Sequence, residues 1–113
     1  MNKYLCVLVL VVCVLVMRVH ATKVFTVQFK NQADIRVFIV NNESQADLKV
    51  YKTTSSGQAA KNDGKWYFVK SASQADKKIF FVNYQNQADL KVFFVDSPSR
   101  AGWKNKTKQH LLL

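Results

Sequence analysis

The sequence predicts a small all-β domain, and three observations support this fold class. A Gln-Ala-Asp turn that runs directly into a short strand occurs four times, at residues 31–40, 44–53, 73–82 and 86–95. From Lys23 onward, apolar residues recur with a period of about two, which is typical of strands. Val, Ile, Phe and Tyr dominate these segments, and none of them has the spacing of an amphipathic helix.

The first 21 residues have the layout of a secretory signal peptide. Lys3 provides a positive start, residues 4–17 form an apolar run, and Val19 and Ala21 occupy the −3 and −1 positions of a cleavage site. The run is shorter than the roughly 20 apolar residues that cross a bilayer. We therefore predict cleavage before Thr22 and export, as a secreted protein or, in a bacterium, a periplasmic or cell-surface one. A retained membrane anchor is the alternative.

Removal of this segment changes the composition of the chain. Both cysteines, Cys6 and Cys13, lie in it, so the single domain predicted at residues 22–113 has no disulfide and depends on its core and hydrogen bonds. Without Lys3 and Arg18, 15 of the 17 basic residues remain against 7 acidic ones, a net charge of +8. Such a charge is typical of proteins that bind anionic polymers or surfaces, and also of strand-rich surfaces that lysine keeps soluble.

The domain consists of two halves that superpose without a gap at an offset of 42 residues: Lys23 falls on Lys65, and Asp34 falls on Asp76. We therefore predict an internal duplication of a strand–turn–strand–turn–strand unit. Residues 54–64 form the loop between the halves, because they are rich in Ser, Gly, Lys and Asn. The second half is followed by a basic tail at residues 104–113.

The two faces of each repeated strand differ in polarity. One face is apolar: Ile35, Val37 and Ile39; Leu48 and Val50; Ile79 and Phe81; Leu90, Val92 and Phe94. Neither face is wholly polar, so the strands are expected to be covered on both sides toward their ends. The other face starts with Asp, continues with Lys or Arg in every copy, and then turns aromatic. Residues i and i+2 lie on the same side of a strand, so each Asp is expected beside a cation at the start of its strand.

Four carboxylates at equivalent positions invite a catalytic or metal-binding interpretation: Asp34, Asp47, Asp76 and Asp89. A catalytic acid–base pair needs carboxylates in unlike environments, whereas these four have nearly identical neighbours. A site for a hard cation needs oxygens that converge without competing lysines. We therefore predict a structural role, in which each Asp accepts backbone N–H bonds and pairs with the adjacent cation. The glutamines of the same motif are expected to bridge neighbouring turns: Gln32, Gln45, Gln74 and Gln87.

Few other residues suggest chemistry. Residues 22–113 contain one histidine, His110, and no glycine-rich phosphate loop, so we predict no enzyme, no cofactor and no metal site. Two sequons, at Asn42 and Asn105, are candidates for N-glycosylation in a cell with an endoplasmic reticulum.

An acid-free basic stretch near the C-terminus is a candidate contact for an anionic partner. Its members are Arg100, Trp103, Lys104, Lys106 and Lys108. Basic side chains next to an aromatic ring can bind nucleic acid or glycans. Alternatively, Trp103 packs on the rim of the domain and the lysines are solvated.

The repeats together resemble a known family. The Gln-Ala-Asp units, the central Trp66-Tyr-Phe-Val69 and the closing Ala101-Gly-Trp103 are similar to the 7(1) septoil knot domain family over about residues 23–113. The resemblance implies a small β domain whose backbone forms a deep seven-crossing torus knot, and it implies no activity. The sequence departs from the common family pattern at Lys52-Thr53, where polar residues replace an aromatic–aliphatic strand end.

Two classes of function remain. The first is a non-enzymatic binding module for anionic polymers or surfaces, which the net charge favours. The alternative is a structural or protective extracellular scaffold with no small ligand, which the scatter of lysines along the strands fits equally well. The salt dependence of binding to a polyanion distinguishes these classes.

Overall fold

The computed structural model describes residues 22–54 and 63–112. The predicted signal peptide lies outside these residues. The strands are β1 (Thr22–Thr26), β2 (Ile35–Ile39), β3 (Leu48–Lys52), β4 (Lys65–Phe68), β5 (Lys77–Phe81), β6 (Leu90–Val95) and β7 (Gly102–Trp103). The 3-10 helices are η1 (Lys30–Gln32), η2 (Glu43–Gln45), η3 (Ala72–Gln74), η4 (Gln85–Gln87), η5 (Pro98–Arg100) and η6 (Lys106–Leu112). In the described ranges, none of the helices has the length and apolar content to cross a membrane.

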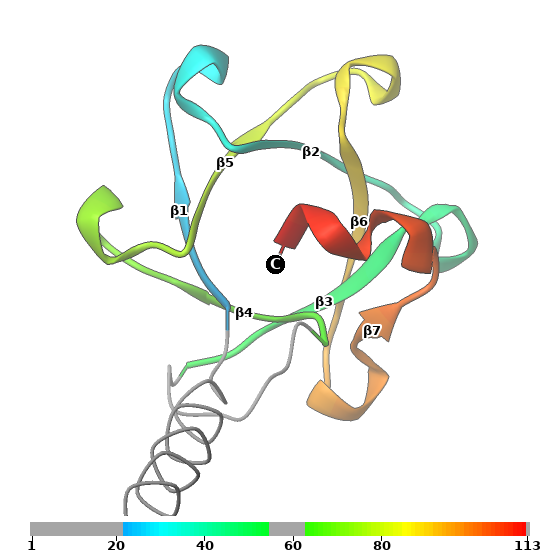
Figure 1. The fold of residues 1–113 in the computed structure, drawn as a ribbon. Coiled ribbons are helices and arrows are strands. Elements are labelled where there is room, and N and C mark those ends of the chain that lie inside the picture. Colours follow the sequence, from blue (N-terminus) through cyan, green and yellow to red (C-terminus); the bar gives the residue numbers. More distant parts are fainter. Residues whose placement is uncertain (1–21, 55–62, 113) are drawn as a thin grey trace, which may run out of the picture.

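Six parallel strands close into a barrel (Figure 1). Their order around it is β4-β1-β5-β2-β6-β3, and β3 pairs back with β4. Successive strands of each half are therefore not neighbours, because β5 lies between β1 and β2, and β6 lies between β2 and β3. The short strand β7 adds to β3 in the antiparallel direction. The prediction of a small, single all-β domain is confirmed.

Each Gln-Ala-Asp motif forms a single 3-10 turn before its strand. In η1, the Gln32 N–H donates to the Phe29 carbonyl at 3.0 Å, and the Ala33 N–H donates to the Lys30 carbonyl at 3.2 Å. The residues on either side of the turn, Phe29 and Ala33, are extended, so the chain leaves and re-enters a strand path within a few residues. These turns project outward from the ring of strands in Figure 1.

The core fills the centre of the barrel and draws on both halves of the sequence. Its members in β1–β6, each at most 2% exposed, are Val24, Ile35, Val37, Leu48, Val50, Trp66, Ile79, Leu90 and Val92. Burial of an aliphatic side chain of this size contributes about 1.5–3 kcal/mol. The predicted apolar face is thus buried at the first positions of each strand. Ile39, on the same face, is 46% exposed at the end of β2.

The two ends of the barrel are closed differently. At the end where the strands start, η6 crosses the opening, places Leu112 in the core and packs Leu111 against it (Figure 1). At the end where the strands finish, the last inward position of each strand forms the rim of the barrel, here called the mouth. Its residues are Thr26, Ile39, Lys52, Phe68, Phe81 and Phe94. The phenylalanines of this mouth are partly buried against the core.

Lys52 belongs to the part of the sequence that departs from the common family pattern. Its ammonium lies 5.1 Å from the ring centroid of Phe68 and 4.9 Å from that of Phe94. The polar pair does not interrupt β3, since Lys52 pairs in register with Trp66 and the buried Thr53 donates its N–H to the Trp66 carbonyl at 2.9 Å. The cation therefore occupies the place of an apolar side chain between two rings.

Replacement of Lys52 by Met is expected to lower the free energy of unfolding by up to about 1 kcal/mol, because it keeps the alkyl stem and removes the charge that the two rings attract. Urea titration measures this difference. Lys30→Met, at an exposed lysine of η1, is the matched control and should be close to neutral. A Lys52→Met variant as stable as the parent protein would show that the cation adds nothing to the packing of its stem.

One glycine is required by the fold at the predicted turn between the halves. Gly64 has φ +93°, a conformation that side-chain-bearing residues rarely adopt, and a Cβ there would collide with the Lys49 carbonyl. Its own carbonyl accepts the Tyr51 N–H at 2.9 Å. The turn therefore sets the position at which β4 starts beside β3.

Candidate binding surface

The four repeated aspartates hold the starts of strands from the two halves together. The Asp34 N–H donates to the Lys78 carbonyl at 2.8 Å, and the Lys78 N–H donates to Asp34 Oδ2 at 2.8 Å. The same two-way bonding joins Asp47 with Lys91, Asp76 with Lys23, and Asp89 with Arg36. Each carboxylate thus accepts the N–H of the second residue of a strand, 44 or 53 residues away in sequence.

The ion-pair partners of two aspartates differ from the prediction. Asp89 pairs with Arg36 of β2 at 3.3 Å, and Asp47 pairs with Lys108 of η6 at 3.3 Å. The predicted pairing with the cation two residues further along the same strand is therefore wrong for these two. The reason is the closed barrel, which brings cations of other segments to the start of each strand.

The glutamines of the motif are all exposed: Gln32, Gln45, Gln74 and Gln87. Within residues 22–54 and 63–112, the hydrogen bonds that hold these turns are backbone bonds, and no side-chain amide of the four joins a neighbouring turn. The predicted amide bridges are thus not part of the described structure.

The outer face of the barrel carries the predicted cation and aromatic residues in a pairing across strands that we did not predict. Each strand presents a Lys or Arg and, two residues later, an aromatic residue. The strand register places every one of these cations opposite an aromatic residue of the adjacent strand: Lys23 with Tyr67, Lys78 with Phe25, Arg36 with Phe80, Lys91 with Phe38, Lys49 with Phe93, and Lys65 with Tyr51. We call this ring of six pairs the cation–aromatic belt. The sequence contains its signal, because the cations recur every 13 residues within each half.

The belt cations differ in their acidic neighbours. Arg36 pairs with Asp89, Lys49 lies 4.0 Å from Glu43, and Lys65 lies 2.8 Å from Asp63. In the part of the chain that the structure describes, the ammonium groups of two others have no acidic side chain within ion-pair distance: Lys78 and Lys91. The aromatic members are all half-buried, so each keeps some surface open to solvent.

The basic residues predicted to contact an anionic partner are largely folded onto the barrel. Arg100 pairs with Asp96 at 3.0 Å and with Glu43 at 3.4 Å. The Lys104 ammonium donates to the Glu43 carbonyl at 3.2 Å. Trp103, in β7, packs against the core. The two remaining members lie in η6, where Lys106 is exposed and Lys108 is half-buried.

Lys108 is part of a polar centre around Asp47, which is only 5% exposed. Asp47 Oδ2 accepts the Lys91 N–H at 2.9 Å and the Lys108 ammonium at 3.3 Å, and Asp47 Oδ1 accepts the Asn105 amide at 3.3 Å. Burial alone raises the pKa of Asp47. The hydrogen bonds from Lys91, Asn105 and Lys108 and the charge of Lys108 outweigh this effect, so the pKa lies below its ordinary value.

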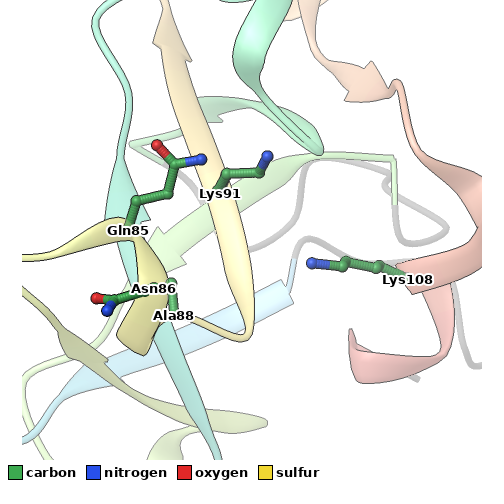
Figure 2. Close-up of a pocket in the computed structure, with 5 residues that line it drawn as sticks. All are labelled: Gln85, Asn86, Ala88, Lys91 and Lys108. Atoms are coloured by element: carbon green, nitrogen blue, oxygen red, sulfur yellow. The ribbon is translucent and has the colours of Figure 1, made fainter.

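An open depression lies between η4 and η6, beside this centre (Figure 2). It has a volume of about 410 Å³ and is lined by Gln85, Asn86, Ala88, Lys91 and Lys108. Figure 2 shows Lys91 on β6 and Lys108 on the opposite side, with the Lys108 side chain pointing from η6 toward β6. The depression therefore joins one cation of the belt to one cation of the C-terminal segment.

Comparison with known families identifies the fold. The sequence profile of the 7(1) septoil knot domain matches residues 21–104. The chain belongs to the 7(1) septoil knot domain family. No curated protein matches the chain. The matched part contains the whole cation–aromatic belt and all four aspartate pairs of the septoil knot domain, whereas η6 lies beyond it.

The two sequons of this septoil knot domain differ in accessibility. Asn42 is exposed at the start of η2, where a glycan would extend into solvent. Asn105 is half-buried, because its amide nitrogen bonds Asp47 and its amide oxygen accepts the N–H and hydroxyl of Thr107. A glycan on Asn105 would have to displace η6 from Asp47.

Proposed function

We propose that residues 22–113 act as an exported, non-enzymatic binding module for anionic polymers or surfaces. The observation that carries this proposal is the cation–aromatic belt, in which six cations face outward and each lies opposite an aromatic residue. Cations replace the counterions of a polyanion, and partly open aromatic surface beside them adds sequence-tolerant contact area. Because the belt closes around the barrel, a flexible polymer can engage several consecutive pairs at once.

The hydrogen bonds of the other polar residues support a non-enzymatic role. Each of the four repeated carboxylates accepts the backbone N–H of a neighbouring strand. His110 Nδ1 lies 3.0 Å from the Thr107 carbonyl and so closes a turn of η6. In the described ranges, no three His, Cys, Asp or Glu side chains gather as metal ligands.

The alternative is a structural or protective extracellular scaffold without a small ligand. The observation that favours it is the pairing of β1–β6, each of which has a strand on both sides. A closed barrel presents no unpaired strand edge to other chains. A protein of this kind needs its lysines only for solubility.

We also infer that the domain arose by duplication and that its backbone is knotted. Duplication is supported by the gapless offset of 42 residues and by the adjacency of corresponding strands, since β1 lies next to β4, β2 next to β5, and β3 next to β6. Knotting is supported by the family description and by the interleaved strand order. Neither inference is needed for the binding proposal.

Removal of two belt charges is expected to flatten the salt dependence of polyanion binding. In the double variant Lys78→Gln/Lys91→Gln, the slope of log affinity against log salt for single-stranded DNA should fall in magnitude by about 1.4, because each lysine releases roughly 0.7 counterion. Heparin should show a change of the same sign. Fluorescence anisotropy at several salt concentrations measures both.

The matched control is Lys30→Gln/Lys106→Gln, which removes two exposed lysines outside the belt. If the two double variants change the salt-dependence slope equally, polyanion binding depends on the net charge of the protein and not on the belt. If the parent protein has negligible affinity for every polyanion near 0.15 M salt, where the Debye length is about 8 Å, the binding module is excluded and the scaffold remains.

A further inference from the structure

We propose that the depression between η4 and η6 is a subsite for one acidic sugar unit, a uronate or sulfated sugar of an acidic polysaccharide. The inference rests on the proposed function and names its partner class. The depression has a volume of about 410 Å³, which falls in the range of small-ligand pockets, about 300–1,000 Å³.

The charge of the subsite comes from two lysines that are held differently. Lys108 is fixed, because its ammonium donates to Asp47 Oδ2 at 3.3 Å and to the Asp89 carbonyl at 3.1 Å. An ammonium has three donors, so one remains for a ligand oxygen. The Lys91 ammonium is available to a ligand, because Asp47 accepts a hydrogen bond only from the backbone N–H of Lys91. Lys91 on β6 and Lys108 on η6 thus line the depression from different elements, and an anionic group bound there would lie near both (Figure 2).

The neutral part of the lining favours a sugar over a nucleotide. Gln85 and Asn86 supply amide groups that both donate and accept, which suits the hydroxyls beside a uronate or sulfate. Binding of a base requires an aromatic ring for stacking, and the five lining residues include none.

The subsite lies at the η4 turn because Lys108 of η6 bonds the Asp89 carbonyl directly after that turn and lines the depression beside it. The corresponding turn of the same half has Ala72 and Ser73 in the places of Gln85 and Asn86, and Lys78 in the place of Lys91. Both Lys78 and Lys91 belong to the belt and neither has an acidic side-chain partner among the described residues. Lys78→Gln is therefore a control with the same chemistry and the same change of charge as Lys91→Gln.

The test is a titration of the isotope-labelled protein with a galacturonate trisaccharide, followed by NMR, with inorganic phosphate and a six-nucleotide thymidine oligomer as comparison probes. Lys91→Gln is expected to weaken trisaccharide binding about tenfold, the loss of one charged contact. Lys78→Gln, which removes a belt cation outside the depression, is expected to weaken it clearly less than Lys91→Gln does. Gln85→Ala/Asn86→Ala should weaken the trisaccharide several-fold and leave phosphate unchanged.

Equal losses in Lys91→Gln and Lys78→Gln would overturn the subsite while leaving polymer binding by the belt intact. Tighter binding of the thymidine oligomer than of the trisaccharide would overturn the acidic sugar as ligand. The proposed function fails by a different result, the absence of binding to any long polyanion. Lys108→Gln can disturb the fold through Asp47, so the conclusion depends on Lys91 and the amide pair.

Discussion

Refolding of the fully denatured chain is expected to take far longer than the milliseconds to seconds of ordinary small β domains. β5 has to pair with β1 and β2, and β6 has to pair with β2 and β3, so many native pairs join distant residues. A knotted course adds the threading of a terminus before the last pairs form. Unfolding should also be slow, because interleaved strands cannot detach one at a time. Fluorescence of the buried Trp66 after manual mixing measures both rates.

Two controls separate threading from other slow steps. Pro98→Ala removes the only proline of the chain, so a slow phase that persists does not arise from proline isomerisation. Fusion of a stable folded domain to each terminus should slow refolding further, because a bulky end has to pass through the loop. Refolding within milliseconds that is unaffected by the fusions would contradict a knotted course.

The repeated strands and turns could be predicted because their causes are local. The Gln-Ala-Asp turn closes with hydrogen bonds over three residues, such as Gln32 N–H to the Phe29 carbonyl. The period of two in Ile35-Arg36-Val37 is sufficient to identify a strand and its apolar face, which the structure places in the core. Such features depend on neighbours in sequence, which the sequence displays directly.

The strand order could not be predicted, because it is decided by residues far apart. Parallel strands usually require a long crossover connection, whereas here a chain with short turns reaches a parallel position by skipping one place around the barrel. Asp34 therefore bonds Lys78 rather than its own strand. The cation–aromatic belt was predictable only in part. The 13-residue spacing of its cations is visible in the sequence, whereas the pairing of each cation with an aromatic residue of another strand depends on the strand register.

The role of the C-terminal segment was the hardest part to predict. The sequence of residues 104–113 predicts a solvated basic tail, because its lysines do not alternate with apolar residues. Leu112 nevertheless enters the core, and Asn105 and Lys108 bond the buried Asp47. Four aspartates with the same sequence context consequently have unequal environments, and Asp47 is the buried one.

Asp47→Asn is expected to lower the free energy of unfolding at pH 7 by about 3 kcal/mol, the low end for breaking a buried charge pair. An amide oxygen in the place of Oδ2 can still accept the Lys91 N–H and the Lys108 ammonium, but without the negative charge that pairs with Lys108. The amide NH₂ in the place of Oδ1 then faces the Asn105 donor. Asp34→Asn is the matched control at the equivalent position. Its side chain is exposed and accepts one backbone bond, so its cost should be about 1 kcal/mol.

The effect of Asp47→Asn should depend on pH, because the folded-state pKa of Asp47 is lowered. A lowered pKa gives stability that is present above the unfolded-state value of about 3.9. This stability is lost as the pH falls through the folded-state pKa, where Asp47 takes up a proton. The difference between the parent protein and Asp47→Asn should therefore be constant from about pH 5 to pH 7 and shrink below about pH 4.

Urea titrations across this pH range, with Lys108→Met and the double variant, complete the measurement. If the Lys108 charge is the main stabilising partner, the coupling energy of the cycle should exceed about 1 kcal/mol at pH 7 and vanish in acid. Equal costs for Asp47→Asn and Asp34→Asn would mean that the contacts of η6 contribute nothing. A large cost for Asp47→Asn without coupling to Lys108 would assign it to the hydrogen bonds from Lys91 and Asn105 instead.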